Sequence, residues 1–237
     1  MKFTAYASGS SGNLYSVSDG KTSLLLEAGL TLKEMQWLTG HTLSEHDACF
    51  ISHAHKDHCK GAKNLQDKRG VLVYCNHHTM KSTGVGLLMN SQTYQQVGTI
   101  DVLAFDVEHL DQASGDRIPT FGFYLHSTFD HESLVFITDT FYSEPRFYKP
   151  TIMAIECNYA SDLLPAYINQ AVKDRLVKSH MSLETCIELL KANDLSQCRE
   201  IHLIHISQGN GDPERFVREV ESATGIATYA APKRREI

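Results

Sequence analysis

The stretch His53-Ala54-His55-Lys56-Asp57-His58 puts three imidazoles and one carboxylate within six consecutive residues. Packing alone does not require such a density of ligand groups, whereas zinc and related divalent metals bind imidazole and carboxylate together. The preceding residues 48–52 are apolar up to the final serine, which predicts a short buried strand that ends where the histidines begin. Ligands at a strand end are held by the sheet and can face an open cleft. The stretch therefore predicts a site for one or two metal ions and favours hydrolysis as the chemistry.

The composition is that of an ordinary globular protein. The 237 residues are 42% hydrophobic and 21% charged, which is enough apolar material for a sizeable core. We expect one domain over residues 1–237, with a disordered basic tail at residues 232–237. No apolar run approaches the ~18 residues that a membrane helix needs, and residues 1–6 lack the apolar core of a signal peptide. We therefore expect a cytoplasmic protein with no membrane partner.

Charge and cysteine content limit the function less sharply. The net charge of −6 argues against strong non-specific binding to nucleic acid. Bound divalent ions would nevertheless make the cleft locally positive. The six cysteines include no Cys-x-x-Cys pair, which indicates reduced thiols instead of a disulfide framework.

Apolar periodicity predicts mostly strands in the first half of the chain and alternating helices and strands in the second. Strands are expected at residues 2–6, 14–18, 23–27, 48–52, 71–75, 100–107, 121–126, 134–138, 151–156 and 201–206. Helices are expected at residues 31–39, 166–177, 183–192 and from 213 to about 222, with Ser182 as the N-cap of the third. Residues 81–96 suggest no more than a loop. This order fits an α/β protein in which sheets pack face to face and helices cover them.

The short cluster cannot close a metal site by itself, so further ligands are expected elsewhere in the chain. A single histidine or aspartate is more often a surface, core or turn residue than a ligand. Four residues differ from that background because each lies at the end of an apolar strand or the start of a helix: His109, Asp139, His180 and His205.

In this order the residues resemble the signature of the metallo-β-lactamase superfamily, which is His-x-His-x-Asp-His followed by a separate histidine, an aspartate and a late histidine. A finer resemblance, to the YycJ/WalJ-type nuclease subgroup, is carried by residues 8–13, 24–29, 156–158, 180–182 and 205–210. The chain departs from that subgroup where Glu27 replaces an aspartate, Thr138 replaces a glycine and Tyr159-Ala160 replaces His-Asp. These departures bear on substrate choice more than on metal binding.

The resemblance implies an αββα four-layer sandwich, with two mixed β-sheets flanked by helices and the metals at one edge. It implies two divalent ions, with zinc favoured and manganese or iron as alternatives. Residue by residue, it assigns His53, His55 and His109 to the first metal. It assigns Asp57, His58 and His205 to the second, with Asp139 as the bridge.

The resemblance also implies a dinuclear metal-dependent hydrolase of phosphodiester bonds, most simply a nuclease or exonuclease acting on DNA or RNA. Metal-bound hydroxide would attack phosphorus, and Asp57 would take part in catalysis. His180 is expected to donate a proton to the leaving group. Ser182 and Asn210 are expected to contact the substrate phosphate.

Three other functions remain open from the sequence. A phosphodiesterase of cyclic nucleotides or similar small esters would use the same metals, and the compact acidic chain favours it somewhat. The same fold can also hydrolyse thioesters or β-lactams. A catalytically idle metal-binding or scaffolding protein is disfavoured, because it would have no need for His180 beside a complete ligand set.

Overall fold

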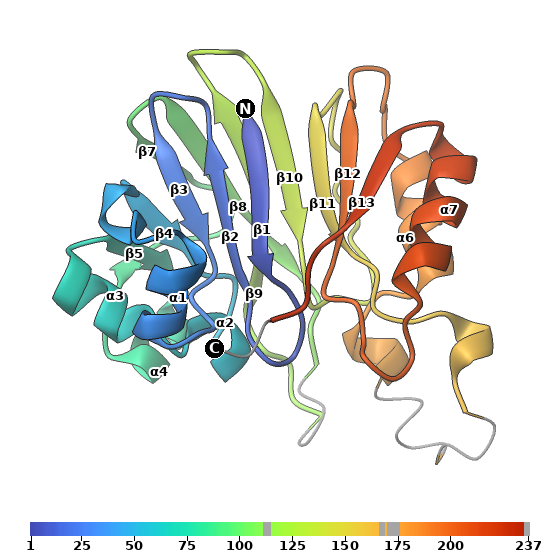
Figure 1. Ribbon diagram of the computed structural model, residues 1–237, viewed down its shortest axis with the longest axis horizontal. Coiled ribbons are helices and arrows are strands. Elements are labelled where there is room, and N and C mark those ends of the chain that lie inside the picture. The colour runs from blue at the N-terminus through green and yellow to red at the C-terminus, as the bar shows by residue number, and fades with distance from the viewer. Residues whose placement is uncertain (111–114, 166–168, 170–175, 235–237) are drawn as a thin grey trace.

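The computed structural model of the protein describes residues 1–110, 115–165, 169 and 176–234. Two β-sheets pack face to face between helices, as Figure 1 shows. Most of the helix expected at residues 166–177, and residues 235–237 of the basic tail, lie outside the described ranges. Within that tail, Arg234 donates to the carbonyl oxygen of Ser11 at 3.0 Å and forms an ion pair with Glu34.

The first sheet has six strands in sequence order. β1, β2 and β3 pair antiparallel, and the pairs from β3 to β6 are parallel. The strands are β1 (Lys2–Ala7), β2 (Leu14–Ser18), β3 (Ser23–Leu26), β4 (Ala48–Phe50), β5 (Leu72–Cys75) and β6 (Leu87–Leu88).

The second sheet has seven strands in the order β13-β12-β11-β10-β9-β8-β7. The pairs from β13 to β10 are parallel, and those from β10 to β7 are antiparallel. The strands are β7 (Tyr94–Val97), β8 (Ile100–Val107), β9 (Thr120–Ser127), β10 (Ser133–Ile137), β11 (Ile152–Glu156), β12 (Glu200–Ile204) and β13 (Ala227–Ala230).

Three apolar clusters separate the layers. One fills the space between the sheets, the second lies between the second sheet and its helices, and the third lies between the first sheet and its helices. The helices on the first sheet are α1 (Leu32–Leu38), α2 (Lys56–Cys59), α3 (Ala62–Arg69) and α4 (His77–Thr83). Those on the second are α6 (Leu183–Lys191) and α7 (Pro213–Thr224), which lie beside β12 and β13 in Figure 1. The predicted αββα sandwich with two mixed sheets is confirmed.

Several local predictions are also confirmed. Ser182 caps α6 by accepting from the backbone N–H of Thr185, and the six cysteines are free thiols. The α-helices and strands that were not predicted from the sequence are α2, α3, α4, β6, β7 and β13. The expectation of a loop at residues 81–96 was wrong, because β6 and most of β7 lie there. In α3 only Ala62 and Leu65 are buried, so its apolar periodicity is weak. No helix in the described part of the chain is long and apolar enough to cross a membrane.

The topology brings six strand ends to one edge of the sandwich. β3 and β4 are parallel in the first sheet, and β8, β10, β11 and β12 run in a common direction in the second. Side chains that follow the carboxyl ends of these strands therefore meet at the same edge, which is where ligands bind in open α/β sheets.

Gly29 lets the chain after β3 approach the segment that carries the histidine cluster. A Cβ at Gly29 would lie 1.6 Å from the carbonyl oxygen of Asp57. The same carbonyl accepts from the backbone N–H of Asn13 at 2.8 Å, and the N–H of Ala28 donates to the carbonyl of His58 at 2.8 Å. Backbone bonds thus fix the position of Asp57 and His58 relative to the first sheet.

Replacing Gly29 by alanine should force this backbone contact apart. We expect Gly29→Ala to lower the free energy of unfolding by ~1–3 kcal/mol. The melting temperature should then fall by roughly 2–10 °C, measured by circular dichroism. Gly209→Ala is the matched control, since a Cβ at Gly209 meets nothing within 4 Å. Equal melting temperatures for the two variants would contradict the argument.

Candidate metal centre

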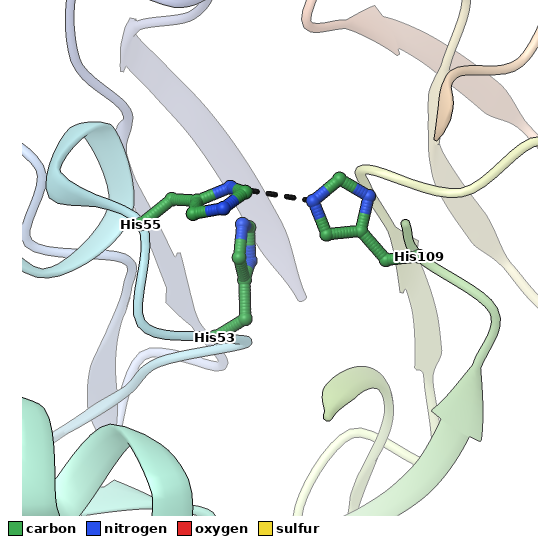
Figure 2. Close-up of side chains that lie close together, drawn as sticks. All are labelled: His53, His55 and His109. Carbon is green, nitrogen blue, oxygen red and sulfur yellow. Dashed lines mark hydrogen bonds between the residues drawn. The ribbon is translucent and has the colours of Figure 1, made fainter. Parts of the chain in front are cut away.

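Three histidines form the first part of the site. His53 follows β4, His55 is the N-cap of α2, and His109 follows β8 from the other sheet. Figure 2 shows the rings of His53 and His55 turned toward His109, whose Nε2 lies 3.3 Å from Nδ1 of His55. One ligand atom from each residue lies within 4.8 Å of the others. Two nitrogens on a tetrahedral metal with bonds of ~2.0–2.1 Å lie roughly 3.3 Å apart, so this spacing suits a metal.

Asp57, His58 and His205 form the second part. Asp57 and His58 lie in α2, and His205 directly follows β12. Oδ2 of Asp57 lies 3.3 Å from Nε2 of His58 and 3.5 Å from Nε2 of His205. One ligand atom from each of these residues also lies within 4.8 Å of the others.

Asp139 lies between the two sets. Its Oδ2 is 3.1 Å from Nε2 of His58 and 3.8 Å from Nε2 of His205. It also forms a group within 4.8 Å with His53 and His58, so it reaches ligands of both sets. The structure thus brings together all seven residues predicted as ligands, and the bridging role of Asp139 stays a prediction.

The ligand histidines are oriented through their second ring nitrogen. In four of the five an oxygen lies near Nδ1, which leaves Nε2 to face the centre, as is usual for metal-binding histidines; in His55 it is Nδ1 that lies near His109. The oxygens belong to Ser52 (2.9 Å from His53), Ser179 (3.4 Å from His109), Glu27 (3.4 Å from His58) and Glu156 (3.2 Å from His205).

Buried nitrogens without hydrogen bonds test whether a metal fits. In the described part of the chain, Nε2 of His53 and Nε2 of His205 are buried and accept or donate no hydrogen bond. Buried polar atoms are normally satisfied, so these nitrogens call for a ligand. Imidazole and carboxylate donors together suit a divalent transition metal. The site therefore fits a divalent metal, and its donors do not single out zinc.

The carboxylates draw positive charge to the centre. Burial lowers the pKa of His53 well below its ordinary value and lowers that of His109 to about 4, so both rings are neutral at pH 7. Burial is the largest single effect on the pKa values of His58 and His205 and acts in the same direction, but Asp139 and the neighbouring carboxylates together outweigh it. The pKa of His58 is raised well above its ordinary value, and that of His205 to about 10. The protonated rings of His58 and His205 thus supply the positive charge that the buried carboxylates require.

Left-handed backbone places three of these side chains. Glu27, Asp139 and His205 have φ angles of 67°, 49° and 54°. Such angles cost non-glycine residues of order 1–3 kcal/mol and persist only where the surroundings enforce them. Backbone N–H groups are fixed accordingly: that of Glu27 donates to Phe50 at 2.9 Å, and that of His205 donates to Oγ of Ser8 at 2.7 Å. The left-handed residues also explain why β3, β10 and β12 end one or two residues before the strand ends that the sequence predicted.

His180 lies beside the second set. Its Nδ1 is 2.6 Å from Oε1 of Glu156, and its ring stacks on His205 with centroids 5.3 Å apart. Oε2 of Glu156 accepts from the backbone N–H of Thr140 at 2.9 Å. The buried Glu156 thus fixes the ring plane of His180 at the border of the centre.

Comparison with known proteins gives the family. Residues 22–206 match the family model described as "Beta-lactamase superfamily domain". The chain belongs to the metallo-β-lactamase superfamily. It is similar to exodeoxyribonuclease WalJ of Streptococcus pneumoniae, with 29% identity over 90% of this chain and 84% of the relative. It is also similar to exodeoxyribonuclease YycJ of Bacillus anthracis, with 26% identity over 90% of this chain and 85% of the relative.

Solved structures agree on the fold of this superfamily member. The metallo-beta-lactamase fold protein YhfI from Bacillus subtilis superposes with a TM-score of 0.75 and 16% identity, over 98% of this chain and 97% of that protein. The resemblance to the superfamily and to its WalJ/YycJ-like members, inferred from the sequence, is therefore confirmed.

Two predicted substrate residues have other contacts in this metallo-β-lactamase fold. Oγ of Ser182 accepts from the N–H of Thr185 and donates to its hydroxyl, both at 3.2 Å. Asn210 lies after β12, and its N–H donates to Oγ of Ser207 at 3.2 Å. The phosphate contacts of both residues stay predictions.

No orienting role was predicted from the sequence for the residues that hold the ligands in place. Glu27 and Glu156 are fully buried behind histidines, and Asn13 and Asn158 donate to Asp57 and His205. All four lie in segments that carried the resemblance to the nuclease subgroup, which was the available signal.

Glu27 should affect metal binding indirectly. It lies behind His58 and contacts the metal ligand, not the metal itself. We expect Glu27→Gln to weaken zinc binding ~10–100-fold, because the neutral amide makes His58 a poorer ligand. Titration against a chromogenic chelator measures this. Glu45→Gln, at an exposed position outside the site, should bind zinc like the parent protein. Unchanged affinity in Glu27→Gln would refute the orienting role.

Proposed function

We propose that this protein is a metal-dependent exonuclease that hydrolyses phosphodiester bonds of DNA. The observation that carries the proposal is the meeting of two ligand sets, from both sheets, across Asp139. The reaction class is inferred from the relatives, since two proteins named exodeoxyribonucleases align with this chain over 90% of its length. Hydrolysis of phosphodiester bonds is thus the supported reaction class, and DNA as substrate is the finer proposal.

The chain's own residues set up the reaction. Divalent ions bound here would supply Lewis-acid stabilisation of the phosphate and lower the pKa of a coordinated water from 15.7 to about 7. Asp57 and Asp139 balance part of that positive charge and leave a net attraction for a phosphate. The proposal includes two ions, one for each ligand set, with zinc, manganese or iron as candidates.

His180 is proposed as the proton donor to the leaving oxygen. Glu156 accepts from its Nδ1 at 2.6 Å, so Nε2 is the nitrogen that would deliver the proton. The same contact fixes the orientation of the ring, as a proton donor needs. Stacking on His205 keeps the ring beside the second ligand set.

A panel of substrates tests the proposed function. The purified protein, loaded with zinc or manganese, should shorten end-labelled DNA, and a chelator should abolish this activity. The same preparation is offered duplex DNA, single strands, RNA and bis-p-nitrophenyl phosphate. Hydrolysis of the small ester with all polymers left intact would replace the proposal by a small-molecule phosphodiesterase, and cleavage of RNA alone would move the substrate to RNA.

The two assigned roles predict different defects. His180→Ala should keep its metal content and lose turnover ~10²–10⁴-fold, because only the proton donor is removed. Asp57→Ala should lose metal, since its carboxylate belongs to the second set. Metal content by elemental analysis and turnover on DNA are measured together for both variants. Full turnover in His180→Ala, or full metal occupancy in Asp57→Ala, would overturn the corresponding role.

A further inference from the structure

The outer face of β7, β8 and β9 carries a row of large side chains. The register pairs Tyr94 with Leu103 and Leu103 with Tyr124, so these three lie on one face of the sheet, with Phe105 next along β8. The alternate residues of β8 and β9 belong to the core between the sheets. Figure 1 places α6 and α7 at the opposite end of this sheet, beside β12 and β13.

The loop between β10 and β11 turns this face into a pocket. Its residues Pro145 to Tyr148 line one side of a pocket of ≈ 430 Å³, and the row on the strands lines the other. At the base, Phe147 stacks on Tyr124 with ring planes 11° apart. Tyr94 and Tyr148 line the mouth and are 64% and 75% exposed. Two exposed aromatic rings therefore border one opening.

The aromatic pocket adjoins a second pocket, whose lining includes sequence neighbours of two metal-centre residues. A neighbouring pocket of ≈ 660 Å³ shares Pro145 with it and reaches Glu108 and Phe141. These residues stand one and two positions from His109 and Asp139 in the sequence. A DNA strand that leaves the centre past Glu108 and Phe141 would therefore reach the aromatic pocket at Pro145.

Two cations lie beside tyrosine rings of this loop, one of them the exposed ring of Tyr148. The guanidinium of Arg146 lies 5.9 Å from the centroid of the Tyr142 ring, and Nζ of Lys149 lies 4.9 Å from that of Tyr148. Nη1 of Arg146 donates to the carbonyl oxygen of Glu144 at 2.9 Å, which braces the loop.

The neighbouring pocket of ≈ 660 Å³ is negatively charged, unlike the aromatic pocket with its two nearby cations. It is lined by the carboxylates of Asp106, Glu108 and Glu144 and by the single guanidinium of Arg117. Phosphates are therefore favoured at the aromatic end, beside Arg146 and Lys149, instead of along the whole path. The occupant that suits this end combines flat neutral rings with a negative backbone.

We propose that the aromatic pocket binds a nucleobase of a single DNA strand whose end lies at the metal centre, by stacking on Tyr94 and Tyr148. This inference rests on the proposed function for the identity of its occupant. Every base has a flat face, so stacking on aromatic rings tolerates any sequence, which suits an enzyme that degrades a strand progressively. Arg146 and Lys149 border the adjoining phosphates.

The test compares three variants with the parent protein. In Tyr94→Ala/Tyr148→Ala the affinity for a fluorescein-labelled thymidine oligonucleotide, measured by anisotropy, should fall ~5-fold or more. Tyr94→Phe/Tyr148→Phe keeps the rings and should bind like the parent. Phe129→Ala is the matched control, since Phe129 is 52% exposed, has Nζ of Lys21 5.4 Å from its ring and lines none of these pockets. Metal content and turnover of bis-p-nitrophenyl phosphate should stay unchanged in all three.

The outcomes separate the inference from the proposed function. Unchanged oligonucleotide affinity in the alanine variant overturns the stacking site, even if nuclease activity is present. If light scattering shows a dimer for the parent protein and a monomer for the alanine variant, the stacking site is overturned in favour of a second copy of the chain as occupant. Loss of oligonucleotide binding in the alanine variant alone supports the inference, also where the parent protein proves to cleave no DNA. Tyr148→Ala by itself, on an exposed loop side chain, serves if the double variant does not fold.

Discussion

Buried negative charge at the edge where the two sheets meet is the constraint on which the site depends. Glu27 and Glu156 are fully buried and Asp139 is 2% exposed. A buried carboxylate costs several kcal/mol unless a cation or strong donors compensate it. The imidazoles of His58 and His205 lie against these groups, and Asp139 and its neighbouring carboxylates together raise their pKa values in spite of burial. The fold therefore selects for positive charge at this point, and a divalent cation satisfies that demand more completely than two protons do.

The strand topology explains how residues so far apart in sequence reach one point. Six strands end at the same edge. Five site residues follow those ends by one to three positions: Glu27, His53, His109, Asp139 and His205. Glu156 is the last residue of β11, and Asp57 and His58 lie in α2, the helix after β4. The left-handed backbone at Glu27, Asp139 and His205 turns the chain sharply where each strand stops. Gly29 completes the arrangement, since only a residue without Cβ leaves room for the carbonyl of Asp57. The local strain is tolerated because both sheets, with their apolar clusters, hold the strand ends in place.

The sequence predicted what local patterns encode. The density of ligands at residues 53–58, the strand ends before His109, Asp139 and His205, and the cap at Ser182 were all legible in short segments. Glu27 and Glu156 were not assigned, because a strand-terminal carboxylate reveals its partner only once the register of both sheets is known. The aromatic pocket was invisible for the same reason: Tyr94 and Tyr148 stand in segments with no shared motif, and residues 81–96 suggested only a loop. Helix α3 was missed because it buries only two side chains.

Charge around the centre couples metal and substrate. The protein carries a net charge of −6, and Asp106, Glu108 and Glu144 line the pocket beside the ligands. An anionic substrate that approaches the protein without metal meets mostly repulsion there, since Arg117 is the single cation among the described residues that line that pocket. Bound divalent ions reverse the sign at the point where the phosphate must lie. Substrate affinity is then a property of the metal-loaded form, while the stacking surface at Tyr94 and Tyr148 acts on neutral bases and is independent of that charge. Under the proposed function, recognition would thus be divided between the metal, which would hold the phosphate, and the aromatic pocket, which would hold the strand.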